Sequence, residues 1–158
     1  YNDYNHFYDS TAIGTDIVLN DQSEGYTAGG ELLATYTVNS SWSLQGSYSY
    51  IDEKISGDSV FAGGSPKNLA SLQSELKMTE KVSLLQNFYY TDHYSSARNT
   101  YASQLKMDLG MTWKIRPNMN ITAWGVNLLD PQTAEYADNE NPAAESPRAF
   151  YIQLEMSF

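Results

Sequence analysis

Alternation of apolar and polar residues is the dominant pattern along this chain, and helical periodicity is scarce. The pattern is cleanest between Tyr101 and Ile115, where seven of the eight odd positions are large and apolar and the even positions are small or polar. Successive side chains of a β-strand point to opposite faces of a sheet. This segment therefore predicts one long strand with an apolar face and a polar face.

The same alternation recurs and predicts about eight long strands. Besides 101–115, we expect strands at 1–8, 26–38, 42–50, 70–78, 82–90, 119–129 and 150–158. The connections alternate between short ones, at 39–41, 79–81 and 116–118, and long ones, at roughly 9–23, 54–66, 94–100 and 131–146. In an up-and-down antiparallel sheet, this order places every tight turn at one end and every long loop at the other, as in outer-membrane barrels.

Two all-β architectures fit this pattern, a soluble β-sandwich and a membrane β-barrel. The predicted strands have about 9–15 residues, whereas soluble strands average roughly 5–6 and membrane-spanning strands need about 9–11. Aromatic residues on the apolar face lie near the strand ends, as in the aromatic girdles of barrels. The predicted lipid-facing girdle residues are Trp42, Tyr50, Tyr101, Trp113, Phe150 and Phe158. The pattern favours the membrane barrel over the sandwich.

The charge and the Cys and His content of the chain argue against several classes of function. Nine Lys and Arg against nineteen Asp and Glu give a formal net charge of −10, which argues against a nucleic-acid binder. The 158 residues include no Cys, which excludes disulfides and thiolate metal sites, and only two His. No run approaches the ~18–20 apolar residues of a membrane-spanning helix. We expect no enzymatic activity, no cofactor and no metal site.

Closure of a barrel by this chain alone would require 1–8 to pair with 149–158. Eight strands can close a small barrel. The segment 1–8 is short and rich in Asn, Asp and Tyr, so it is poorly suited to face lipid. An open sheet would leave unpaired edges in hydrocarbon. We therefore expect residues 1–158 to be the C-terminal part of a larger barrel, and a piece of a longer protein.

Four motifs occur in order along nearly the whole chain. They are E-G-Y-T-A-G-G-E-L at 24–32, P-K-N-L-A-S-L at 66–72, V-N-L-L-D at 126–130, and the closing segment from Pro147 to the terminal Phe158. In their residues and in their order, these motifs resemble those of the TonB-dependent outer-membrane receptors. The resemblance implies an antiparallel up-and-down transmembrane barrel of the 22-stranded type, of which these are the last eight strands.

The resemblance also implies a function and partners. Members of the family take up scarce nutrients, such as ferric siderophores or cobalamin, across the outer membrane of Gram-negative bacteria, powered by the TonB–ExbB–ExbD complex. The TonB box and the plug domain do not occur within these residues. Implied partners are the plug domain of the parent chain, TonB through the missing N-terminal part, outer-membrane lipid and lipopolysaccharide, and the barrel-assembly machinery through Phe158. The alternative is a small self-closing eight-stranded barrel with an adhesive, anchoring or structural role, and a third possibility is an outer-membrane hydrolase.

The loop-end residues offer few candidates for chemistry. Asp92 and His93 are adjacent, so within a strand they would point to opposite faces and could not act together unless the strand has ended. His93, Tyr94 and Arg98 are instead candidates for contacts with a ligand at the external rim. Acidic residues gather in the long loops, where solvation, cation binding and repulsion of anions are alternatives. The polar positions expected to face the lumen are Gln45, Gln73, Glu75, Gln104, Lys106, Asp108, Gln153 and Glu155.

Overall fold

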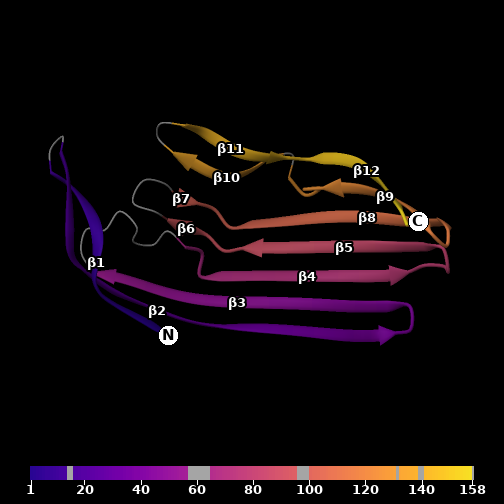
Figure 1. Cartoon of the computed structure of the whole chain (residues 1–158), viewed down its shortest axis with the longest axis horizontal. Helices are drawn as coiled ribbons and strands as arrows, with labels where there is room; N and C mark the ends of the chain where they lie inside the picture. Colours follow the sequence, from indigo (N-terminus) through magenta and orange to yellow (C-terminus); the bar gives the residue numbers. More distant parts are fainter. Residues whose placement is uncertain (14–15, 57–64, 96–99, 131, 139–140, 158) are drawn as a thin grey trace.

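The chain forms one sheet of eight antiparallel strands in the order β1-β2-β3-β4-β5-β8-β9-β12 (Figure 1). The structure is a computed structural model that describes residues 1–13, 16–56, 65–95, 100–130, 132–138 and 141–157. The strands are β1 (Asn2–Ile13), β2 (Asp16–Asn39), β3 (Trp42–Ser56), β4 (Asn68–Lys77), β5 (Val82–Thr91), β8 (Gln104–Arg116), β9 (Met119–Val126) and β12 (Ala149–Met156). The eight-stranded, all-β, up-and-down architecture expected from the alternation is confirmed. No helix among the described residues is long and apolar enough to cross a membrane.

The three expected tight turns join β2 to β3, β4 to β5 and β8 to β9, and they lie at one end of the sheet (Figure 1). Side chains close two of them. The Ser41 amide donates to Asn39 Oδ1 at 2.8 Å, and the Thr79 hydroxyl oxygen accepts from the amides of Lys81 and Val82 at 3.1 and 3.0 Å. Asn and Thr side chains that bond to the backbone two or three residues on favour such turns. This end is called the turn end below, and the opposite end is the loop end.

Three of the four segments expected as long loops contain hairpins. The ladder of β1 and β2 runs through 9–23 to the pair Ile13 and Asp16. The other two hairpins are β6 (Tyr94–Ser95) with β7 (Thr100–Tyr101), and β10 (Gln132–Asp138) with β11 (Asn141–Pro147). In the fourth segment, 57–64 lies outside the described residues. A ladder uses only backbone N–H and C=O groups, so a polar composition does not prevent strand pairing.

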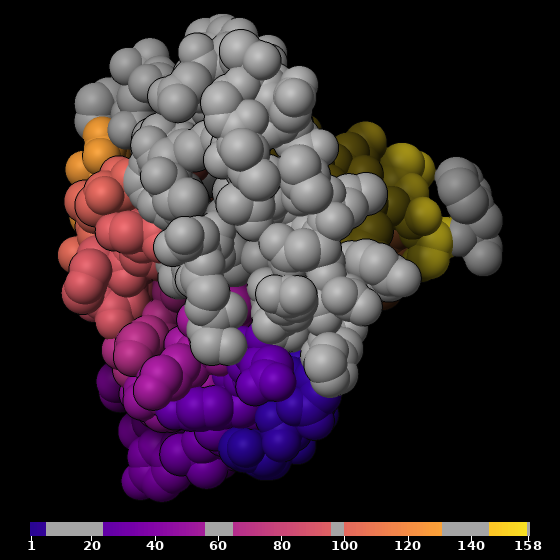
Figure 2. All heavy atoms as spheres, turned by 90° about the vertical axis from the view of Figure 1, so that its left-hand side faces the viewer, coloured from indigo at the N-terminus to yellow at the C-terminus, as the bar shows by residue number. Residues whose placement is uncertain are grey.

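The sheet has no core of its own. Among the described residues no hydrophobic side chain is buried, and the chain exposes 11206 Å². A compact monomer of 17.7 kDa is expected to expose about 8,000 Å². Seen from the loop end in Figure 2, the described strands follow an arc from the indigo N-terminal part to yellow β12. The sheet is curved, and no second layer of described residues packs on either of its faces.

The sheet ends in β1 and β12, and the turn-end half of β2 is also an open edge. β1 pairs with β2 only between Asp16 and Thr27, so the half of β2 from Ala28 to Asn39 has a partner on one side only, β3. β12 pairs with β9 along its length, and the structure does not pair it with β1. Within the described ranges the eight strands therefore do not close into a barrel.

The last strand is fixed at the turn end. The Ser157 amide donates to the Asn118 carbonyl at 3.1 Å, and Asn118 Nδ2 donates to the Ser157 carbonyl at 3.0 Å. Asn118 lies in the turn between β8 and β9, so the end of β12 is tied to its neighbouring hairpin.

Candidate functional site: two sheet faces and the loop-end rim

The registers sort the side chains into two faces, because directly opposed residues of antiparallel strands lie on the same face. One face, called the apolar face here, is almost continuous in Leu, Met, Ile and aromatic residues. Its members include Leu32, Tyr36, Leu44, Tyr48, Leu72, Leu76, Leu84, Phe88, Leu105, Met107, Leu109, Met111, Trp113, Ile121, Ile152 and Leu154. Ser74 and Gln86 are exceptions and lie opposite each other. Ser74 is 6% exposed and accepts a hydrogen bond from the Trp42 indole at 3.0 Å.

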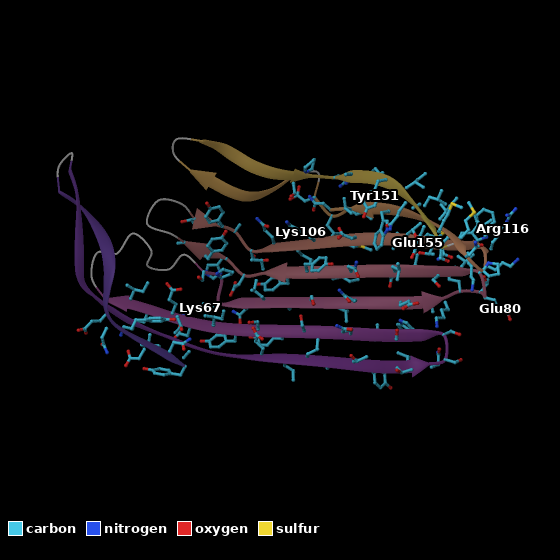
Figure 3. All side chains as sticks on the ribbon, viewed as in Figure 1. Lys67, Glu80, Lys106, Arg116, Tyr151 and Glu155 are labelled. Carbon is cyan, nitrogen blue, oxygen red and sulfur yellow. The ribbon has the colours of Figure 1, made fainter. Side chains whose placement is uncertain are left out.

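The opposite face, called the polar face, carries all eight positions expected to point to a lumen. Cross-strand hydroxyl pairs join Ser47 to Ser71 at 2.7 Å and Thr112 to Thr122 at 2.9 Å. Figure 3 shows Lys106 and Glu155 along these strands. The alternation predicted from the sequence thus extends in register across the sheet.

An aromatic pair interrupts the polar face. Trp124 and Tyr151 are opposed and stack with ring centroids 6.4 Å apart. Trp124 lies flat over Gly110, where an added Cβ would come within 2.8 Å of the indole ring. Glycine at 110 therefore lets the indole approach the backbone, and the alternation of β8 contains no sign of this contact.

The predicted girdle residues lie at both ends of the apolar face. Trp42 and Trp113 are near the turn end, and Tyr50 and Phe150 are toward the loop end. Phe158 lies outside the described residues. Tyr101 is placed differently from expectation, because β8 begins at Gln104 and Tyr101 belongs to the separate β6–β7 hairpin. The 101–115 segment is therefore not one continuous strand.

A hydrogen-bonded network joins the ends of β3, β4 and β5 at the loop-end rim. Tyr48 Oη donates to Asn68 Oδ1 at 2.6 Å, and Asn68 Nδ2 donates to Asp92 Oδ2 at 2.5 Å. The Asp92 carboxylate also accepts from the His93 amide at 2.8 Å and lies 2.9 Å from His93 Nδ1. Because β5 ends at Thr91, Asp92 and His93 are free of strand geometry and do contact each other. No hydroxyl of a described residue is hydrogen-bonded to His93.

The pKa of Asp92 is lowered by this network, chiefly by the hydrogen bond from Asn68 and then by the His93 ring and amide. We expect Asn68→Ala to raise the pKa of Asp92 towards 3.8, the ordinary value. Because the folded pKa is depressed, the contribution of this carboxylate to stability is present at neutral pH and is lost as the pH falls through the folded pKa. NMR titration of the Asp92 carboxyl carbon measures the shift.

Tyr48→Phe is the matched control for this measurement. It removes the bond to Asn68 Oδ1 and leaves the bond from Asn68 to Asp92 in place. A pKa of Asp92 that is unchanged in Asn68→Ala would show that the amide does not set the charge at this rim.

Of the three rim residues proposed for ligand contact, the structure describes His93 and Tyr94. The His93 side chain is 75% exposed. Tyr94 instead stacks on Tyr101, with ring centroids 4.5 Å apart, and burial raises the pKa of its hydroxyl. Arg98 lies outside the described residues. At this rim Lys67 is paired with Asp52 of β3. Its Nζ lies 2.6 Å from Asp52 Oδ1, and that carboxylate raises the pKa of Lys67.

The V-N-L-L-D motif forms a junction between β9 and the β10–β11 hairpin. Asn127 is 5% exposed and has φ 53°, the left-handed region that Asn tolerates better than most residues. Its backbone amide donates to Asp108 Oδ1 at 2.9 Å, and its Nδ2 donates to the Ser146 carbonyl at 2.7 Å. The Leu128 amide then donates to the Met107 carbonyl at 2.9 Å. The motif therefore ties the chain to β8 as it leaves β9.

Acidic residues do not form a metal site in the part of the chain that the structure describes, because no three His, Asp or Glu side chains gather there. The densest acidic run of the sequence, 138–141, includes 139–140, which lie outside the described residues.

Comparisons with known proteins support the fold. No protein-family profile and no curated protein matches the chain. Three solved structures are similar along most of it. The copper transporter OprC is 19% identical with a TM-score of 0.80, and the match covers 97% of this chain and 26% of OprC. The ferric-catecholate import receptor Fiu from K12 E. coli is 16% identical with a TM-score of 0.78, and the match covers 99% of this chain and 24% of Fiu. The siderophore receptor PiuA from Acinetobacter baumannii is 17% identical with a TM-score of 0.73, and the match covers 87% of this chain and 22% of PiuA. The chain spans about a quarter of the length of these proteins. It has the fold of a segment of the β-barrel of TonB-dependent receptors.

Proposed function

We propose that residues 1–158 are the C-terminal part of the barrel of an outer-membrane receptor that imports a scarce nutrient with energy supplied through TonB. The observation that carries this proposal is a curved sheet with an almost continuous apolar face, over which no layer of described residues packs. Water does not favour so large an apolar surface, since monomeric soluble proteins rarely expose contiguous patches above a few hundred Å². Lipid on the apolar face and water or a plug on the polar face account for both faces.

The open edges support a larger barrel over a small self-closing one. A backbone edge in hydrocarbon is not viable, so the free edges of β2 and β12 need strands beside them. In the self-closing alternative, β1 would pair with β12 as well as with β2. Among the described residues β1 pairs only with the loop-end half of β2, and β12 pairs only with β9. The plug domain, the TonB complex and the barrel-assembly machinery, with Phe158 as its recognition residue, are the remaining proposed partners.

The substrate class is proposed from the structural neighbours. PiuA, Fiu and the ferric enterobactin receptor PfeA from Pseudomonas aeruginosa are described as siderophore or ferric receptors, and OprC as a copper transporter. A ferric siderophore is therefore our first candidate and copper the second. His93, whose side chain is exposed, Tyr94 and Arg98 stay candidates for contact with it.

Uptake of labelled substrate tests the proposal. Cells that carry the parent gene should accumulate ⁵⁵Fe-siderophore or ⁶⁴Cu, and deletion of the gene or of tonB should remove that uptake. Complementation with the gene should restore it only when TonB is present. Uptake that persists without TonB would contradict energised import, and equal uptake with and without the gene for both metals would contradict a receptor for either.

Hydrogen exchange tests the larger barrel directly. In the complete barrel, we expect the backbone amides of Ala28–Asn39 that point away from β3 to be protected, because an upstream strand pairs with them. Amides of the central strand β4 serve as the internal reference, since β3 and β5 flank it on both sides. Fast exchange along this edge of β2 beside a protected β4 would show that the edge is open in the membrane.

A further inference from the structure

A shallow apolar groove lies on the apolar face along β9. It has a volume of about 410 Å³, and its lining includes Leu109, Met111, Ala123, Gly125, Phe150 and Ile152. It forms because β9 carries small residues at 123 and 125, whereas β8 and β12 carry large ones opposite them. Ala123 is exposed on its floor, and Phe150 and Ile152 on β12 are 74% and 75% exposed.

The loop-side wall of this groove is built by two side chains that converge on Gly125. A Cβ at Gly125 would lie 3.0 Å from both Leu128 Cδ2 and Phe150 Cε1. These side chains cover Gly125, which is buried, and the groove is open over Ala123. The site can therefore take a slender apolar chain that lies along the strands.

A guanidinium group lies just beyond that wall. Arg148 is exposed, and its Nη2 donates to the carbonyl of Leu128 at 2.8 Å, which holds the group beside the groove. Ala123 is opposite Ile152, and Arg148 lies four residues before Ile152, just outside β12 and about 13 Å towards the loop end. An arginine at that distance is placed to bind a phosphate at the membrane surface while the groove takes the attached hydrocarbon.

We propose that this groove binds lipid A, with an acyl chain over Ala123 and a phosphate on Arg148. The inference rests on the proposed function, which puts the loop end at the outer surface of the outer membrane, where lipid A lies. The charge at its loop end distinguishes this groove from another small-residue position on the same face, Ala70 on β4. There Ala70 lies between Tyr48 and Tyr90. The charged groups at that loop end are the Asp92 and Asp52 carboxylates and Lys67, whose Nζ is bound to Asp52, so the net negative charge would repel a phosphate.

The test measures binding of purified lipid A to the complete barrel in detergent micelles, by native mass spectrometry. Ala123→Phe fills the groove and Arg148→Gln removes the charge. We expect each to lower lipid A affinity about tenfold or more, since a charge-assisted hydrogen bond is worth roughly 1.5–3 kcal/mol. Ala70→Phe is the matched control on the same face and should leave affinity within about twofold. Heat-modifiable migration on gels confirms that each variant is folded.

Two further ligands, dephosphorylated lipid A and phosphatidylglycerol, separate the contributions of the phosphate and of the acyl chains to binding. With dephosphorylated lipid A, we expect Arg148→Gln to bind as the parent does and Ala123→Phe still to bind more weakly. Phosphatidylglycerol should bind at least tenfold more weakly than lipid A; equal binding would overturn the assignment to lipid A. Equal losses in Ala123→Phe and Ala70→Phe would overturn the groove, and loss of a dimer in Ala123→Phe with lipid A binding unchanged would assign the face to a second copy.

The proposed function and this inference fail in different ways. Lipid A binding that depends on Ala123 and Arg148, in a protein without TonB-dependent uptake, would uphold the groove and reject the transport role. Uptake with no lipid A binding would reject the groove alone.

Discussion

Leu109→Arg should destabilise the folded barrel in phospholipid vesicles by about 2–4 kcal/mol, the cost of an arginine near the bilayer midplane. Leu109 lies in the middle of β8 on the apolar face, opposite Gln86 on one side and Gly125 on the other. In the proposed barrel it points into hydrocarbon. Denaturant titration of the complete barrel in vesicles, followed by tryptophan fluorescence, measures the loss.

Gln73→Arg is the matched control for Leu109→Arg. Gln73 is on the polar face of β4 and is next in sequence to Ser74, which shares a row across the sheet with Gln86 and Leu109. In strands tilted by about 35–45°, a row across the sheet climbs by about 3 Å per strand, so the two positions differ in depth by several Å and, above all, in the face that they occupy. We expect a change within about 0.5 kcal/mol, as for surface substitutions in water. Equal losses for the two arginines would contradict lipid on the apolar face.

Substitution of Asn127 should lower the free energy of unfolding in three steps, from the lost side-chain hydrogen bond, from a Cβ at positive φ, and from β-branching. Asn127→Gly keeps the left-handed backbone and loses the bond to the Ser146 carbonyl, so we expect about 1 kcal/mol. Asn127→Ala adds about 1 kcal/mol for a Cβ in that conformation, and the β-branched Asn127→Val adds more, to about 3 kcal/mol in total. The free energy of unfolding of the complete barrel, from denaturant titration, checks the order.

The Asp108 partner tests the same junction from β8. Asp108→Ala leaves the buried Asn127 amide without an acceptor, which costs about 1–3 kcal/mol. Asp108→Asn keeps an oxygen in place and should cost less. If Gly, Ala and Val at 127 were equally stable, the positive φ would carry no strain and the junction would not be held as described.

Much of the fold could be predicted from the sequence because a strand of the proposed barrel faces lipid on one side and water on the other, which requires apolar and polar residues to alternate. The period of two in β8 and β12 and the three short turns were sufficient to place eight strands, and the registers then put Leu109 and Gln73 on opposite faces as the pattern requires. Hairpin extensions were missed because Asn, Asp and Ser indicate exposure to water and do not determine whether the backbone pairs. The phase of the alternation places Tyr101 on β8, whereas its pairing and stacking with Tyr94 place it in the β6–β7 hairpin.

The candidate site could be predicted less well, since its contacts join residues distant in sequence. Asn68 and Asp92 are brought together only by the pairing of β4 with β5. The groove depends on which residues lie opposite Ala123 and Gly125, and the register that decides this cannot be derived from one strand. The V-N-L-L-D motif was the one local indication of the Asn127 junction, and it identified the residues without their contacts.

Because consecutive strands of the main sheet pair with each other, the chain tolerates insertions in its loop-end connections but not inside its strands. One residue inserted inside β4 would turn the side chains beyond it to the wrong solvent. One inserted between β3 and β4, at the loop end, would leave every ladder as it is. In the proposed receptor, mutation can therefore remodel the surface at the loop end while the lipid-embedded wall stays the same.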